Sequence, residues 1–118
     1  MGRNQAIGKK GEEYAVNFLR GRGYQIEAVN FRTPCGEIDI VARDKSALVF
    51  IEVKTRTNKT YGMPYEAVRL RKQAKIRRTA LAYLGARPFR GGIIRFDVIS
   101  ILLGDMGDYK IDHLINAF

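Results

Sequence analysis

GEIDIVARDKSALVFIEVK, residues 36–54, contains two runs rich in β-branched and apolar residues, 37–43 and 48–54, with the short polar break DKSA between them. Two such runs joined by a short break predict an antiparallel β-hairpin. Strand side chains alternate between faces, and both faces are apolar here: Ile38, Ile40, Val49, Ile51 and Val53 on one, and Val41, Leu48 and Phe50 on the other. The hairpin is therefore expected to lie in a sheet that is covered on both sides.

Helical patterns precede and follow the hairpin. Residues 4–20 carry apolar side chains at helical spacing, and the glycine-containing segment 21–23 ends the pattern. A second helix is expected from Pro64, which suits a first helical turn, to about residue 84. Strands are also expected at residues 24–30 and 93–101, with a short edge strand at 109–114. This order predicts a single domain over residues 1–118, an α/β sandwich of αβββαβ order with a central mixed sheet flanked by helices.

The composition limits the class of protein. No apolar run approaches the roughly 20 residues needed to cross a bilayer, and the N-terminal segment lacks the apolar core of a secretory signal. No membrane partner is therefore expected, and we expect a cytoplasmic location. Because Cys35 is the single cysteine and His113 the single histidine, a zinc site of thiolates and imidazoles is excluded within one chain. Any metal must be held by carboxylates and carbonyls, which suit Mg²⁺ or Mn²⁺.

Two carboxylates face each other in the predicted hairpin. If Arg43 and Leu48 close it around the break, Asp39 lies opposite Glu52 at about 4.5–5.5 Å, and Lys54 shares their face. Paired carboxylates repel unless a cation bridges them, so the pattern predicts a Mg²⁺ or Mn²⁺ site with a lysine beside it. The alternative is an ordinary salt bridge of Lys54 with Glu52 or Glu37 on a solvated face.

Two residues of the first helix extend this hypothesis. Glu12 borders the apolar face, whereas Glu13 points away from it. Gly8, one turn earlier, would leave room for a phosphate backbone or a metal. For Glu12, a solvated carboxylate at the edge of the helix is an equal alternative.

Positive charge dominates the chain and concentrates in the second helix. There are 21 Lys and Arg against 12 Asp and Glu, which gives a formal net charge of +9 and a pI near 10.0. Such an excess attracts polyanions through counterion release, so nucleic acid is the leading partner; a basic surface that serves only solubility is the alternative. Residues 69–78 hold six basic residues and no acid: Arg69, Arg71, Lys72, Lys75, Arg77 and Arg78.

Part of this basic segment is placed to meet phosphates. Arg71, Lys75 and Arg78 have the spacing of one helical stripe away from the apolar face, which suits contacts with phosphates and not with bases. Gln73 falls on the apolar side, where it could line a site. A structural hydrogen bond is the equal alternative for Gln73.

The motif Gly36-Glu37-Ile38-Asp39, followed after twelve residues by Glu52-Val53-Lys54, and Glu12 on the leading helix resemble the PD-(D/E)xK nuclease superfamily. Over about residues 5–101 the chain resembles the YraN family of predicted nucleases, which is similar to archaeal Holliday junction resolvases. The resemblance implies a restriction endonuclease-like fold. It also implies a metal ion held by Asp39, Glu52 and the Val53 carbonyl, with Glu12 as an additional ligand. Lys54 would position the attacking water, and Gln73 is similar to a polar helix position of some members.

The sequence thus leads to one expected activity and two alternatives. The expected activity is that of a metal-dependent endonuclease hydrolysing phosphodiester bonds of DNA, with branched or junction DNA as a candidate substrate. The first alternative is a basic nucleic-acid-binding module that has the nuclease fold without turnover. The second is an interaction subunit that uses its charge to join a larger complex. A homodimer is left open in each case.

Overall fold

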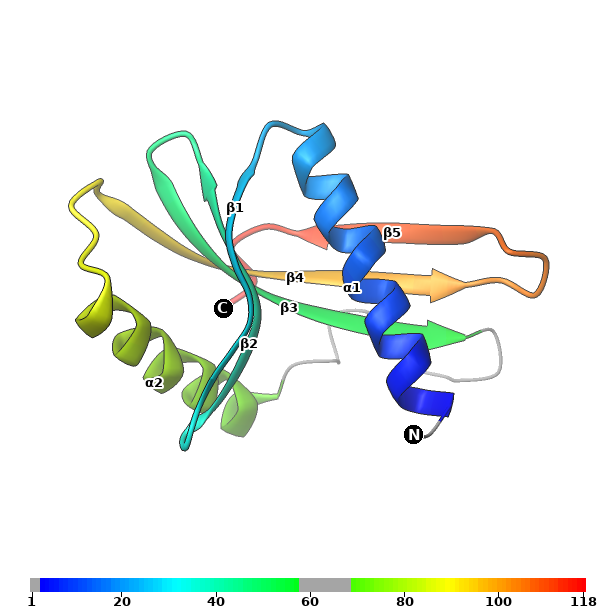
Figure 1. Ribbon diagram of the computed structural model, residues 1–118, viewed down its shortest axis with the longest axis horizontal. Helices are drawn as coiled ribbons and strands as arrows, with labels where there is room; N and C mark the ends of the chain where they lie inside the picture. The colour runs from blue at the N-terminus through cyan, green and yellow to red at the C-terminus, as the bar shows by residue number, and fades with distance from the viewer. Residues whose placement is uncertain (1–2, 58–68) are drawn as a thin grey trace.

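The computed structural model of the protein describes residues 3–57 and 69–118, with side chains from residue 6 onward. Its elements, in chain order, are α1 Arg3–Gly21, β1 Gln25–Thr33, β2 Gly36–Asp44, β3 Ala47–Thr57, α2 Leu70–Ala86, β4 Ile93–Leu103 and β5 Tyr109–Leu114. Figure 1 shows α1 and α2 lying against a strongly twisted sheet. Across the described residues, no helix is long and apolar enough to cross a membrane.

The five strands form one mixed sheet in the order β1-β2-β3-β4-β5. Neighbouring strands are antiparallel except for β3 and β4, which run parallel. A parallel pair needs a crossover connection, and α2 lies in the segment that joins these two strands. The predicted α/β sandwich of αβββαβ order is confirmed, and β5 extends it as an edge strand, as expected.

Each helix packs on its own face of the sheet. Ala15 and Leu19 of α1 join a cluster of buried side chains that includes Val49 on β3. On the other face, Ile76 of α2 packs in a second cluster with Phe50. Burying one such large apolar side chain stabilises the fold by about 1.5–3 kcal/mol. The prediction that the hairpin strands are covered on both sides is therefore confirmed.

One side chain of the hairpin lies on the face opposite to the one expected. Ile38 belongs to the cluster under α2, whereas Ile40 packs under α1. Two residues apart in a regular strand would share a face, so the alternation breaks at Asp39. On β1, Val29 pairs with Ile40 and Phe31 with Ile38, and Asn30 between them has a positive φ of 56°. This kink explains why the prediction for Ile38 was wrong.

The second helix begins later than predicted. Arg69 is extended, with φ −85° and ψ 166°, and α2 runs from Leu70 to Ala86. The first turn contains no acidic residue that would stabilise the positive end of the helix, and the Arg69 side chain makes no capping hydrogen bond. Pro64 lies outside the described residues, so its place in this segment is not described.

A buried ionic network links β4 to β5 and to the segment after β5 on the α1 face of the sheet. Asp97 on β4 is fully buried, and its carboxylate accepts hydrogen bonds from the Arg95 guanidinium and the Asn116 amide. The Nε2 atom of His113 lies 2.7 Å from the same carboxylate. These partners hold the pKa of Asp97 below its ordinary value, although burial alone would raise it. The network explains how a charged residue is tolerated in the middle of the sheet.

Candidate active site

The hairpin register places Asp39 just beyond the end of the β2–β3 ladder. Arg43 pairs with Leu48, as predicted, and the last pair is Ile40 with Ile51. The expected backbone pair of Asp39 with Glu52 therefore does not form. Instead, the Asp39 carboxylate accepts a hydrogen bond of 2.8 Å from the Val53 amide, so the side chain takes the place that a backbone carbonyl would have. Regular backbone pairing of β2 with β3 thus ends here, and a side-chain contact follows it.

The carboxyl groups of Asp39 and Glu52 nevertheless meet. They share a hydrogen bond, and the Glu52 residue is only 7% exposed. Burial, followed by the hydrogen bond and the negative charge of Glu52, raises the pKa of Asp39 to about 9. Because two buried carboxylates repel, one proton is held between them when no cation is present. The juxtaposition predicted from the sequence is thus formed by side chains and not by a backbone pair.

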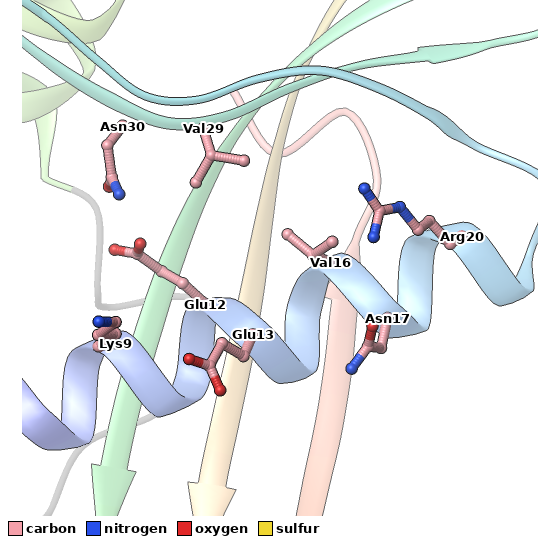
Figure 2. Close-up of a pocket in the computed structure, with 8 residues that line it drawn as sticks. All are labelled: Lys9, Glu12, Glu13, Val16, Asn17, Arg20, Val29 and Asn30. Atoms are coloured by element: carbon pink, nitrogen blue, oxygen red, sulfur yellow. The ribbon is translucent and has the colours of Figure 1, made fainter.

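Glu12 approaches this pair from α1. It is half-buried, its side chain is hydrogen-bonded to Asn30, and burial raises its pKa. It is also close enough to Asp39 and Glu52 for their charges to interact. Figure 2 shows the Glu12 carboxylate directed toward Asn30, with Glu13 pointing away from it as predicted. Both glutamates line a groove of about 340 Å³ between α1 and β1.

A glycine that the sequence analysis did not single out allows Glu12 to come this close. A Cβ atom on Gly11 would overlap the Thr55 side chain of β3, so only glycine fits where the helix crosses this strand. For Gly8, by contrast, no described atom outside its own stretch of helix lies within 4 Å of where a Cβ would be, which agrees with the room expected there. The sequence did carry a sign of this close contact: Gly11 is a glycine inside a helix, four residues before the buried Ala15, and therefore on the face that packs against the sheet.

The residues at this site fit a hard divalent cation in chemistry but do not form a complete cage. Within residues 3–57 and 69–118, no three Asp, Glu, His or Cys side chains lie close enough together to hold a metal. Asp39 and Glu52 could supply two carboxylate ligands, with Glu12 within reach of their charge and water filling the remaining positions, as Mg²⁺ commonly allows. Val53 follows Glu52 on β3, and its amide is engaged by Asp39.

Lys54 lies beside the pair but is not its counterion. Regular pairing of β3 with β4 extends from Ala47 to Thr57, so Lys54 shares a face with Glu52, and its side chain is exposed. Among the described residues, Glu37 pairs with Arg32 at 3.6 Å, and the partner of Glu52 comes from α2. The alternative of a salt bridge between Lys54 and either glutamate is therefore not what the structure contains.

Lys72, which the sequence analysis counted only among the basic residues of the second helix, is the partner of Glu52. Its Nζ atom lies 3.0 Å from Oε2 of Glu52. Partial burial lowers the pKa of Lys72, but its contact with Glu52 and the charges of Asp39 and Glu37 together raise the pKa by more, so the net shift is upward. Oε2 is buried and, among the described atoms, receives no hydrogen bond of good directional geometry, so the contact is an ion pair. Lys72 precedes the buried Ile76 by four residues, and this spacing could have placed it at the sheet.

The predicted phosphate-binding residues lie along the same helix. Arg71, Lys75 and Arg78 are exposed, as a stripe facing solvent requires. Gln73, which directly follows Lys72 on α2, is half-buried, as expected for the apolar side. α2 therefore carries both the counterion of Glu52 and the densest basic surface of the chain.

Comparison with known proteins places the chain in a family. A model of the uncharacterised protein family UPF0102 matches residues 11–101. A UPF0102 protein of Geotalea daltonii is 46% identical over 115 residues, which cover 98% of this chain and 91% of the relative. A UPF0102 protein of Dictyoglomus thermophilum is 44% identical over 118 residues, covering 98% of both chains. The matched segment contains Glu12, Asp39, Glu52, Lys54 and Lys72. The chain belongs to UPF0102, the family that the sequence resemblance identified under the name YraN.

Proposed function

We propose that the protein is a metal-dependent nuclease of the PD-(D/E)xK superfamily that hydrolyses phosphodiester bonds of DNA, with branched or junction DNA as the first substrate to test. The observation that carries the proposal is the shared hydrogen bond of Asp39 and Glu52 in a buried place, next to Lys54. Two buried carboxylates that must share a proton are costly to the fold, and a divalent cation would remove that cost.

Each residue then has a role that its position supports. Asp39 and Glu52 would hold Mg²⁺ or Mn²⁺, with the Val53 carbonyl and Glu12 as further ligands. When bound, the cation supplies activation of water and neutralises charge on the phosphate. Lys54, exposed beside Glu52, would donate hydrogen bonds to the attacking water or to the developing oxyanion.

The substrate would reach these residues along α2. Arg71, Lys75 and Arg78 are exposed on that helix and would bind phosphates without reading bases. Gln73, half-buried between Arg71 and Lys75 in the sequence, and Gly8, which no described residue of another element crowds, would lie next to the bound strand. Binding is therefore expected to depend more on backbone charge and DNA shape than on base sequence.

One observation favours a second candidate function. No three candidate ligand side chains within the described residues gather as a ready metal cage. A protein that binds DNA through its basic surface and retains the nuclease fold without turnover would show this arrangement. The two functions differ in whether a divalent cation binds and whether DNA is cut.

A cleavage assay with a conservative variant separates them. The protein is incubated with duplex, single-stranded, flap and four-way-junction DNA in Mg²⁺, Mn²⁺ or EDTA. Cleavage is expected only with the cations. Glu52→Gln should reduce it by about a hundredfold or more, because a ligand worth several kcal/mol in the transition state is lost.

The matched control for this assay is Glu13→Gln. Glu13 has the same charge and lies next to Glu12, but it is exposed and points away. Its replacement should leave the rate unchanged. Full cleavage by Glu52→Gln would exclude the proposed site, whereas DNA binding without cation-dependent cleavage under every condition would favour the binding module.

A further inference from the structure

Lys72 is in an unusual position for a basic residue of a nucleic-acid-binding helix. Its side chain is 54% exposed, yet its Nζ atom reaches 3.0 Å from an oxygen of Glu52, whose side chain is 7% exposed. The stem of the lysine therefore lies largely in solvent and only its tip enters the site. A side chain held in this way can leave without disturbing the packing of α2 on the sheet, which depends on Ile76, Ala80 and Tyr83.

The atom that Lys72 neutralises is the one that a cation would need. Oε2 of Glu52 is buried and, within the described part of the chain, has no directional hydrogen bond, so the ammonium group is its compensation. A divalent cation held by Asp39 and Glu52 would bring the same positive charge to the same place. Two cations cannot both lie at one carboxylate oxygen without strong repulsion.

We propose that Lys72 is a built-in counterion of the site, which holds Glu52 in the metal-free protein, is displaced when a divalent cation binds, and then binds a phosphate of the DNA. This inference rests on the proposed function. The released ammonium group would join the exposed basic residues Arg71 and Lys75 on the same helix. Loading of the cation would therefore strengthen DNA binding by one phosphate contact, which couples the two binding events.

The first measurement is cation affinity in the absence of DNA. Titration calorimetry with Mn²⁺ compares the wild-type protein with Lys72→Met, Lys72→Arg and Lys75→Met. Lys75→Met is the matched control, because it removes the same charge from an exposed position on the same helix. Lys72→Met should bind Mn²⁺ about fivefold more tightly than Lys75→Met, the factor that corresponds to an ion pair of about 1 kcal/mol. Lys72→Arg should remain close to wild type.

Proton release must be counted in the same experiment. Asp39 and Glu52 share a proton that a cation would expel, and removal of Lys72 could change this step. Repeating each titration in buffers of different ionisation enthalpy gives the number of protons released. The Mn²⁺ affinities of the variants are then compared after correction for the protons released.

The second measurement is the salt dependence of DNA binding, made in a Lys54→Ala background so that bound DNA stays intact. With Mn²⁺ present, Lys72→Met should lower the log–log salt slope by about 0.9, the value of one phosphate contact. In EDTA it should leave the slope unchanged, because Lys72 is then engaged by Glu52. Lys75→Met should lower the slope under both conditions.

The outcomes separate this inference from the proposed function. If the wild-type protein binds Mn²⁺ and Lys72→Met binds no more tightly than Lys75→Met, the counterion role is wrong while the metal site stands. If Lys72→Met lowers the salt slope equally with and without Mn²⁺, the displacement is wrong. If neither the wild type nor any variant binds Mn²⁺, the proposed metal site itself is wrong and the inference falls with it.

Discussion

Asp39 is expected to keep a proton that an exposed aspartate would lose well below neutral pH. Its pKa rises from 3.8 to about 9 because the carboxyl group is buried and faces Glu52. Asp39 is therefore expected in one of two states: protonated when no cation is bound, or ionised when a cation lies beside it. The same environment that makes Asp39 costly to the fold makes it a suitable ligand.

This shift predicts how the metal-free protein responds to pH. Since the folded-state pKa lies above the ordinary value of 3.8, the folded protein binds this proton more tightly than the unfolded chain. The resulting contribution to stability is complete below about pH 4 and is lost as pH rises through about 9, by at most about 1.4 kcal/mol per pH unit. The free energy of unfolding of the wild type, relative to that of Asp39→Asn, should therefore fall between pH 5 and pH 9.

Urea unfolding in EDTA at several pH values measures this difference. Asp39→Asn keeps an oxygen that can accept the Val53 hydrogen bond, so the comparison isolates the ionisation. Saturating Mn²⁺ should remove or reverse the pH trend of the wild type, because the cation favours the ionised form. Parallel pH curves for the two proteins would show that Asp39 titrates as an ordinary surface aspartate.

At the scale of the elements, the sequence predicted the hairpin well and its open end poorly. The polar break at residues 44–47 was enough to pair Arg43 with Leu48, because the length of the loop fixes the register of a hairpin. The contact of the Asp39 side chain with the Val53 amide, and the kink that turns Ile38 to the other face, depend on the third strand, β1. Such tertiary effects leave no periodic signal in the hairpin itself.

The helices show the same division. The apolar periodicity of residues 4–20 located α1, but the need for glycine at position 11 arises only where α1 crosses Thr55. For α2, the charge of residues 69–78 was visible, whereas the assignment of Lys72 to Glu52 required the orientation of the helix on the sheet. The spacing of Lys72 four residues before Ile76 indicated that it faces the sheet. Because Lys72 lies among several other basic residues, it did not stand out in the sequence.

The close approach of α1 to β3 yields a prediction with an internal control. Gly11→Ala would place a methyl group against the Thr55 side chain, which is stiff because it is branched at Cβ. Overpacking of this kind should destabilise the protein by about 1–3 kcal/mol. Displacement of α1 should also move Glu12 and weaken cation binding.

Gly8→Ala is the control for this change. It makes the same substitution in the same helix, at a position where the described part of the chain places no atom from another element within 4 Å of the added carbon. Alanine favours a helix over glycine by up to about 1 kcal/mol, so this variant should be as stable as the wild type or more so. Chemical denaturation of the two variants gives the comparison, and equal stability would show that α1 adjusts to the contact with β3 without cost.

At the scale of the whole molecule, the charge and the candidate site are brought together by α2. The net charge of +9 would attract DNA from any direction, but the acid-free basic segment lies on the helix whose first turn contacts Glu52. A DNA backbone that follows Arg71, Lys75 and Arg78 would therefore be led toward the carboxylate pair. The arrangement of the basic residues, more than their number, should determine productive binding.

Replacement of Arg71, Lys75 and Arg78 by alanine tests this arrangement. All three are exposed, so the variant should fold, and it should lose DNA affinity about equally for all sequences. If each residue binds one phosphate, the log–log salt slope should shrink by roughly 2–3 units, about 0.9 for each contact.

The control replaces three exposed basic residues outside α2, Arg22, Arg90 and Lys110, and so removes the same net charge. The control should retain most of the slope, and at saturating DNA both variants should still cleave, because the carboxylate pair is untouched. Equal losses in the two variants would mean that DNA responds only to total charge and that α2 does not guide it to the site.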